Sequence, residues 1–146
     1  MIEINNLTEC SIKEDLIKQI VKSVLDREEF SDTAELSIAF LGPGRMRKLN
    51  KIYRKKNRVT DVLSFCEKKV TFLKFKIGNL EKVQGLGEIV ICPREVKNNA
   101  KKLDISFEKE LKKVVIHGVL HLLGYDHEKG DQQAQEMQDK EVKYLS

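Results

Sequence analysis

The sequence contains no apolar run long enough to cross a bilayer, and its start, MIEINNLTEC, lacks the basic-then-apolar layout of a secretion signal. We therefore expect a cytoplasmic protein with no membrane partner. Internal repeats, low-complexity tracts and linkers rich in proline, glycine or serine are also missing. The 146 residues, 40% hydrophobic and 34% charged, are consistent with one folded domain over residues 1–146.

Cysteine is scarce as well. Cys10, Cys66 and Cys92 lie far apart, form no CxxC pair and are odd in number. In a reducing compartment these features argue against a disulfide framework. Because Cys66 and Cys92 stand at the ends of apolar runs, we predict that both are small buried hydrophobic residues.

The hydrophobic spacing predicts helices and strands that do not alternate regularly, which favours an α+β domain. Helices are predicted at residues 12–25, 45–53, 93–103, 106–122 and 131–144. Strands are predicted at residues 2–4, 35–41, 62–66 and 88–92, with an extra strand at 70–77 and a turn at Gly78-Asn79.

Residue types predict how three of these helices begin and pack. Ser11 and Glu14 have the spacing of a capping box at the start of the first helix. Ser106 is the predicted N-cap of the fourth helix, which Gly124 is expected to end. Four apolar residues are predicted on the buried side of the second helix: Met46, Leu49, Ile52 and Tyr53.

Positive charge is concentrated in residues 45–58, which we call the basic segment. The chain has 27 basic and 23 acidic residues, so the part outside the basic segment holds 19 basic and 23 acidic residues, a net charge of −4. A local basic feature of this kind suits a polyanion such as RNA, and the alternative is a solvated helix face. Its eight basic residues are Arg45, Arg47, Lys48, Lys51, Arg54, Lys55, Lys56 and Arg58.

All three histidines lie in one stretch, HGVLHLLGYDH, at residues 117–127. His117 and His121, four residues apart on a helix, stack on one face with Cβ atoms about 5–6 Å apart, so both imidazoles can reach one ion. A sharp turn at Gly124 would bring His127 back as a third ligand. Three protein ligands with an open position are the catalytic arrangement of zinc, so we predict one Zn²⁺ per chain. The alternative is three ordinary core or surface histidines.

This spacing is similar to the zinc signature of metzincin peptidases, H-E-x-x-H-x-x-G-x-x-H, with Gly118 in place of the glutamate. A peptidase needs that carboxylate as its general base. A metallopeptidase-like hydrolase therefore remains an alternative that Gly118 disfavours.

Two motifs together resemble the YbeY family, bacterial metal-dependent endoribonucleases implicated in rRNA maturation and ribosome quality control. They are H-G-x-L-H-L-x-G-Y-D-H at residues 117–127 and T-D-V-L-S-F at residues 60–65. Asn50, Arg54 and Gly87-Glu88-Ile89 also match, in order along nearly the whole chain. Two features depart from the family: Cys66 stands where a proline is common, and residues 67–84 are idiosyncratic.

The resemblance implies a small mixed β-sheet flanked by helices, with a zinc-peptidase-like metal helix. It implies zinc on His117, His121 and His127, and a functionally important arginine at Arg54. The implied substrate is single-stranded RNA, notably the 3′ end of 16S rRNA, with the small ribosomal subunit and its assembly factors as partners.

Our mechanistic hypothesis is that zinc polarises a phosphodiester oxygen or activates a water, so that His117 is catalytic as well as a ligand. Arg54 either stabilises developing phosphate charge or only anchors the phosphate. No general base is assigned. A non-catalytic ribosome-assembly factor stabilised by zinc is the alternative from another functional class.

Four polar residues near the two motifs have two interpretations each. In the functional interpretation they line the cleft or hold the metal-binding histidines in orientation. In the structural interpretation they only stabilise turns and strand ends. These residues are Thr60, Asp61, Ser64 and Asp126.

Overall fold

The computed structural model describes residues 1–30, 34–76 and 79–146, and side chains outside residues 68–84. Within those ranges there are four strands and five helices. The strands are β1 (Ile2–Asn6), β2 (Ala34–Phe40), β3 (Val62–Lys76) and β4 (Asn79–Ile91). The helices are α1 (Glu14–Arg27), α2 (Pro43–Arg54), α3 (Pro93–Leu103), α4 (Phe107–Leu122) and α5 (Asp131–Leu145). None of the described helices is both long and apolar enough to span a membrane.

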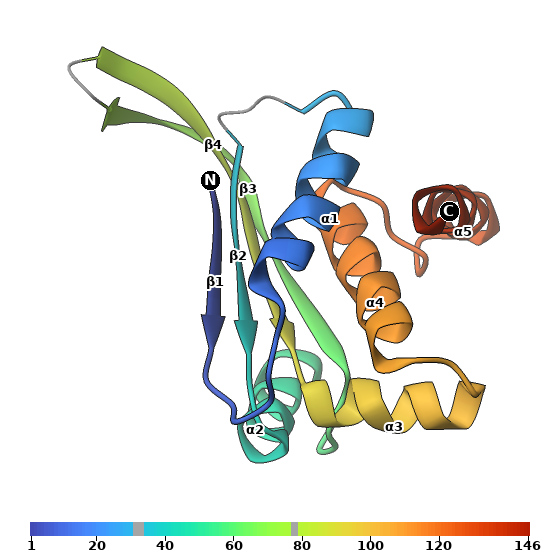
Figure 1. Cartoon of the computed structure of the whole chain (residues 1–146). Helices are drawn as coiled ribbons and strands as arrows, with labels where there is room; N and C mark the ends of the chain where they lie inside the picture. Colours follow the sequence, from blue (N-terminus) through green and yellow to red (C-terminus); the bar gives the residue numbers. More distant parts are fainter. Residues whose placement is uncertain (31–33, 77–78) are drawn as a thin grey trace.

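The strands form one mixed sheet in the order β1-β2-β4-β3. β1 pairs with β2 in parallel, and β2 pairs with β4 in parallel, whereas β3 and β4 are antiparallel. At one end of the sheet, β3 and β4 extend beyond the other two strands (Figure 1). The prediction of an α+β fold with a small mixed sheet is confirmed.

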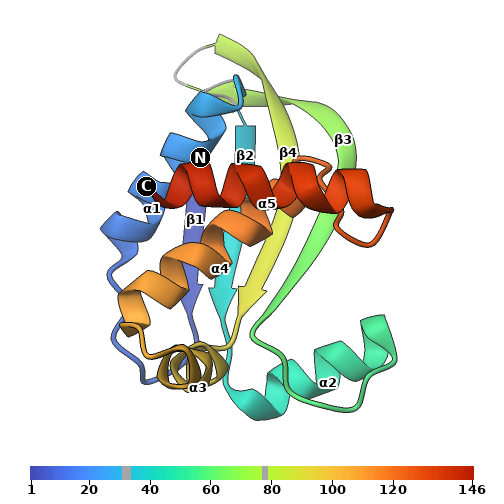
Figure 2. The same ribbon diagram turned by 90° about the vertical axis from the view of Figure 1, so that its right-hand side faces the viewer.

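Three of the helices build two further layers on one face of the sheet. α1 and α4 lie against that face, and α5 crosses over the outside of α4 (Figures 1 and 2). α4 therefore has neighbours on most sides, which explains why nine of its 16 residues are buried, Leu111, Val115 and Val119 among them. The sheet contributes fully buried side chains from β2 and β4, including Phe40 and Ile89.

The predicted capping box of the first helix is wrong. α1 begins at Glu14, its N-cap is Lys13, and no side chain caps it. The chain before it is held instead by a local turn in which Asn6 Oδ1 accepts the Thr8 N–H at 3.0 Å. The carboxylates of Glu14 and Asp15 lie in the first turn, where the helix dipole favours negative charge.

The predicted N-cap of α4 is confirmed. Ser106 Oγ accepts the backbone N–H of Lys109 at 3.1 Å. This bond satisfies one of the amide groups left without a partner in the first turn, so the start of the ligand-bearing helix is fixed by its own sequence.

The predicted buried side of α2 is half right. Met46 is fully buried and Leu49 is half-buried, but Ile52 is 68% exposed and Tyr53 63% exposed. The apolar cluster under α2 includes Met46 and Leu49 of this helix but neither Ile52 nor Tyr53. Asn50 is buried there instead, and its side-chain N–H donates to Arg58 O at 2.9 Å, which holds the following loop.

The prediction for the cysteines is right for Cys92, which is buried, and wrong for Cys66, which is exposed. Cys66 lies on β3, the edge strand of the sheet, and its thiol contacts Leu122 O at 3.4 Å. Among the described residues, no separate extra strand forms after it. Residues 70–76 continue β3 after a register shift, and Asn79 begins β4, whereas residues 77 and 78 of the predicted strand and turn lie outside the described residues.

Candidate metal centre

The three histidines meet at the C-terminal end of α4. His117 and His121 lie one turn apart on the helix, and His127 lies in the loop that follows. The ring centroids of His117 and His121 are 4.7 Å apart, and those of His127 are 5.4 Å and 5.1 Å from them. One possible ligand atom from each residue lies within 4.8 Å of the others. The predicted convergence of the three imidazoles is therefore present.

The end of α4 explains how His127 returns to the helix. Gly124 has a φ of 105°, which an L side chain rarely adopts, and its N–H donates to His121 O at 3.1 Å. The N–H of Tyr125 donates to Leu120 O at 3.1 Å. These bonds use carbonyls of the last helical turn and reverse the chain sharply, as glycine does at many helix ends.

The electrostatics favour metal binding. Burial lowers the pKa of His121, and the neighbouring imidazoles of His117 and His127 lower it further. His121 is therefore held in the neutral form that a metal ion needs. His117 is half-buried and His127 exposed, so the cluster opens to solvent on one side. A donor set of three imidazoles with an open side fits zinc in its catalytic arrangement.

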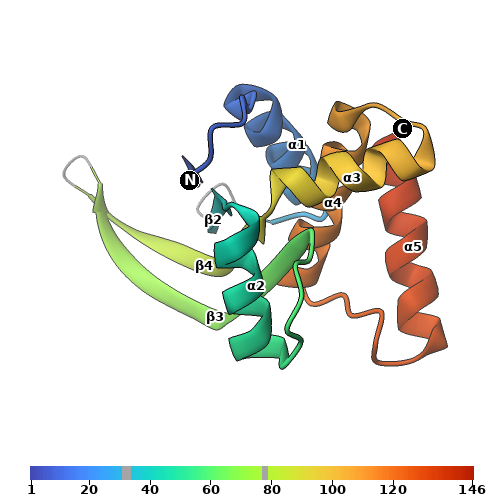
Figure 3. The same cartoon turned by 90° about the horizontal axis from the view of Figure 1, so that it is seen from below.

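The open side of the cluster faces a cleft of about 610 Å³. Its walls come from the end of α2, the start of β3, α4 and the loop after α4, which meet on one side of the molecule (Figures 2 and 3). The lining residues are Tyr53, Arg54, Thr60, Asp61, Val62, Leu63, Ser64, Phe65, Cys66, His117, His121, Asp126, His127 and Glu128.

Arg54 lines this cleft from the last residue of α2. Its guanidinium lies 3.4 Å from Glu128 Oε1, next to His127 in the loop. The arginine that the sequence singled out is thus brought to the same cavity as the three histidines, although more than 60 residues separate them. Both partners of this ion pair are substantially exposed, so the contact is weak and open to competition.

The other seven basic residues of the basic segment lie outside the cleft lining, on α2 and the loop after it. One of them, Arg47, donates from Nε to Asn57 Oδ1 at 2.9 Å. All seven are exposed: Arg45, Arg47, Lys48, Lys51, Lys55, Lys56 and Arg58.

The four polar residues near the motifs all line the cleft. Ser64 Oγ donates to Gly118 O at 3.4 Å, so it contacts the backbone of the helix that carries the ligands. Asp126 Oδ1 accepts the Glu128 N–H at 2.9 Å and thereby shapes the loop around His127. Thr60 Oγ1 and Asp61 Oδ1 lie 3.4 Å apart. Within the part of the chain that the structure describes, none of the four has a hydrogen bond to an imidazole.

Sequence reasoning missed four residues of this region. Tyr53 and Phe65 line the cleft with ring centroids 4.9 Å apart, in an edge-to-face arrangement. Glu128 pairs with Arg54, and Glu141 on α5 contacts His117 Nδ1. One signal for Glu141 exists in the sequence, since it follows the buried residue Met137 by four positions and therefore lies on the buried side of an amphipathic helix.

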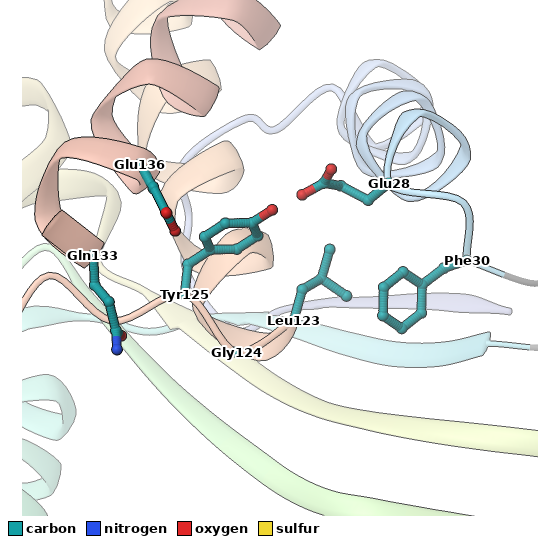
Figure 4. A pocket seen from close by; sticks show the side chains of 7 residues that line it. All are labelled: Glu28, Phe30, Leu123, Gly124, Tyr125, Gln133 and Glu136. Atoms are coloured by element: carbon teal, nitrogen blue, oxygen red, sulfur yellow. The ribbon is translucent and has the colours of Figure 1, made fainter. Parts of the chain in front are cut away.

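A second cavity, of about 390 Å³, lies beside the same loop (Figure 4). The Tyr125 hydroxyl points there toward Glu28. Burial and then the hydrogen bond with Glu28 raise the pKa of Tyr125 to about 12. Glu28 also accepts bonds from Tyr144 at 2.8 Å and Lys140 at 3.2 Å. These contacts join the end of α1 to α5 and the loop, so they support the fold beside the metal centre.

Comparison with known proteins identifies the family. A family model described as Endoribonuclease YbeY matches residues 3–146. The chain belongs to the YbeY endoribonuclease family. The YbeY endoribonuclease of Thermodesulfovibrio yellowstonii is 45% identical over 112 residues, which cover 76% of this chain and 65% of that protein. The YbeY endoribonuclease of Thermoanaerobacter sp. is 36% identical over 137 residues, which cover 91% and 86%.

A solved structure supports the same assignment. The solution structure of TM1509 from Thermotoga maritima is similar with a TM-score of 0.67 and 33% sequence identity. The match covers 99% of this chain and 87% of that one. The predicted family and fold are thereby confirmed, and so is the enzyme class, because the YbeY relatives are named as endoribonucleases, which are hydrolytic enzymes that act on RNA.

Proposed function

We propose that this protein is a zinc-dependent endoribonuclease that cleaves single-stranded RNA in the cleft beside the three histidines. The observation that carries the proposal is the convergence of His117, His121 and His127 on the same cavity as Arg54. The family assignment gives RNA as the substrate class. The exposed basic residues of α2 provide positive charge outside the cleft, where a phosphate backbone would enter.

Each residue has a defined task in this proposal. His117, His121 and His127 would hold the zinc ion, which when bound would act as a Lewis acid on phosphate oxygens and would lower the pKa of water to about 7. Arg54 binds the scissile phosphate and stabilises the negative charge that develops on it. Ser64 and Asp126 fix the helix backbone and the loop that hold the histidines in place. Gly118 contributes no side chain, so the peptidase route through a glutamate at this position is closed.

Single-stranded RNA would be recognised by stacking as well as by charge. Tyr53 lines the cleft and is 63% exposed, and its ring packs edge-to-face against Phe65. A base stacked on an aromatic side chain contributes about 1–3 kcal/mol without sequence preference. Tyr53→Ala is therefore expected to raise KM for single-stranded RNA by at least about fivefold. Ile52→Ala is the matched control, because Ile52 is the exposed neighbour of Tyr53 but does not line the cleft.

We extend the proposal to the biology that the family resemblance implies. The substrate is rRNA, notably the 3′ end of 16S rRNA, and the enzyme serves ribosome maturation and quality control in the cytoplasm. Its partners are the small ribosomal subunit and assembly factors. Support comes from the family assignment and from the exposed basic residues of α2, which are available to a ribonucleoprotein surface.

The test is cleavage of single-stranded RNA by highly purified protein. Wild type is expected to cut the RNA, whereas chelated wild type and a folded His121→Ala variant are not, and readdition of Zn²⁺ should restore only the wild type. Bound zinc is measured in parallel and should equal one ion per chain for wild type. Equal cleavage by all three samples would indicate a contaminating nuclease and refute zinc catalysis.

The role of Arg54 is decided by kinetics. If Arg54 stabilises the transition state, Arg54→Ala lowers kcat as well as kcat/KM. A change confined to KM would show that Arg54 only anchors the phosphate.

The exposed basic residues outside the cleft also favour a second candidate, a zinc-stabilised assembly factor without catalysis. That function predicts intact RNA with pure wild type and a loss of folding in His117→Ala. A metallopeptidase, in contrast, would cut an unfolded protein in the presence of zinc.

A further inference from the structure

Glu141 lies in the second half of α5, on the side of that helix that faces α4. Its Oε1 is in hydrogen-bond contact with Nδ1 of His117. Both side chains are largely removed from solvent, with 17% of Glu141 and 30% of His117 exposed. Glu141 does not line the cleft, so it contacts the imidazole from outside the cleft.

This contact fixes which nitrogen of His117 is free. A carboxylate accepts hydrogen bonds, so in the neutral imidazole of His117 the proton is on Nδ1, and Nε2 is the atom available to donate to a metal. Metal-binding histidines commonly donate their second ring N–H to a carboxylate, which sets the tautomer and the ring orientation. Within the described ranges of the chain, neither His121 nor His127 has a comparable side-chain hydrogen bond.

α5 holds Glu141 firmly in this place. Met137, one turn before Glu141, is 1% exposed, and Tyr144, three residues after it, is 4% exposed. The hydroxyl of Tyr144 donates to Glu28 at 2.8 Å, which ties α5 to the end of α1. The helix therefore cannot turn Glu141 away from His117 without losing buried contacts on both sides.

We propose that Glu141 is a positioning residue for the metal centre: it selects the Nδ1-protonated tautomer of His117 and aims Nε2 of this imidazole at the ion. This inference rests on the metal site of the proposed function. It assigns to α5 a task in metal binding that the three-histidine motif does not contain.

The first experiment measures zinc affinity by competition with a chromophoric chelator, in the absence of RNA. Glu141→Ala is expected to weaken zinc binding by about 10- to 100-fold. Glu141→Gln keeps an oxygen that accepts from Nδ1, so it should lose less affinity than the alanine variant. Asp139→Asn is the matched control, since Asp139 lies on α5, is exposed, and contacts Gln135 rather than a ligand. Its affinity should stay within about twofold of wild type, because screened surface charges act weakly.

The second experiment reads the tautomer directly in metal-free protein by long-range ¹H–¹⁵N correlation. The chain has only three histidines, so its six ring nitrogens can be assigned. His117 should be Nδ1-protonated in wild type, Glu141→Gln and Asp139→Asn, and should populate the other tautomer in Glu141→Ala. Wild-type affinity and an unchanged tautomer in Glu141→Ala would overturn the proposal.

Two further outcomes are decisive. If Glu141→Ala does not fold without metal, the tautomer of His117 in wild type decides, and an Nε2-protonated His117 there overturns the proposal. If wild type binds zinc with the expected dependence on Glu141 but leaves RNA intact, the nuclease function is refuted and the role of Glu141 is supported.

Discussion

Gly118 lies where α4 packs closely against β4, and substitutions there test this packing. A Cβ atom added at Gly118 would lie 3.0 Å from Cγ2 and 3.1 Å from Cδ1 of Ile89 on β4. Carbon atoms in normal contact are about 3.5–4.0 Å apart. Ile89 is 0% exposed and has no solvent to move into. The methyl group of Gly118→Ala must therefore displace a packed core side chain.

Two opposing effects set the magnitude for Gly118→Ala. Overpacking of a core costs about 1–3 kcal/mol, whereas alanine is better than glycine in a helix by about 1 kcal/mol. The single variant should thus lose between about 0 and 2 kcal/mol of unfolding free energy. Ile89→Ala alone should lose about 2–5 kcal/mol, because it opens a cavity. In that background the new methyl at residue 118 has room and should stabilise by about 2 kcal/mol, from helix propensity and burial.

The assay is a double-mutant cycle by urea unfolding of metal-free protein, so that zinc binding does not contribute to stability. We expect a coupling of about 2–4 kcal/mol between Gly118→Ala and Ile89→Ala. The same substitution combined with Ile91→Ala, another fully buried position of β4, is the control and should give a coupling below about 0.5 kcal/mol. A coupling that small in the Ile89 cycle would refute the inferred close contact.

Three further predictions concern single residues. Ser106→Ala should lower Tm by about 2–4 °C, since it removes a cap of about 1 kcal/mol from α4, and Ser106→Asp should restore it; equal Tm values would contradict the role of the cap. Burial raises the pKa of Glu28, but hydrogen bonds from Tyr125, Tyr144 and Lys140 together outweigh burial, so this pKa lies below its ordinary value of 4.5. The stabilisation from ionised Glu28 is therefore complete above its pKa in the unfolded chain and is lost as pH falls through its pKa in the folded protein. The difference in urea midpoint between wild type and Glu28→Gln should shrink below about pH 4. A difference that does not change with pH would contradict this. Glu128→Gln should lower KM for RNA by up to about fivefold at low salt and have no effect at high salt, because Glu128 competes with phosphate for Arg54; an unchanged KM at low salt would exclude that competition.

The sequence predicted well what depends on local spacing. The three ligands lie within 11 residues, so helix geometry and one glycine are enough to place them together. The same holds for Ser106, whose cap involves a residue three positions away. Helical periodicity also placed α2, but it could not show that the apolar cluster under this helix takes in only Met46 and Leu49 of α2. Ile52 and Tyr53 were therefore expected inside and are exposed.

Contacts between distant segments could not be predicted from the sequence, because they depend on how the helices pack. Nothing near Arg54 in the sequence shows that its guanidinium meets Glu128, 74 residues later, because that contact depends on how α2 leaves the sheet. The sequence could place Glu141 on the buried side of α5, but its contact with His117 depends on how α5 crosses α4. Cys66 ends an apolar run and was therefore expected to be buried, but it is exposed because β3 lies at the edge of the sheet.

The position of the cleft follows from that edge strand. Among the described strands, β3 pairs with β4 alone, and α4 packs against β3. Ser64 and Cys66 of β3 contact backbone carbonyls of α4 at 3.4 Å, so the end of α4 carries its histidines to the open border of the sheet. In the proposed function, substrate would reach them past Tyr53 and Glu128 of the cleft lining, whereas Glu141 contacts His117 from α5 and does not line the cleft. Changes on the cleft side should therefore act on RNA binding, and changes at Glu141 should act on the metal.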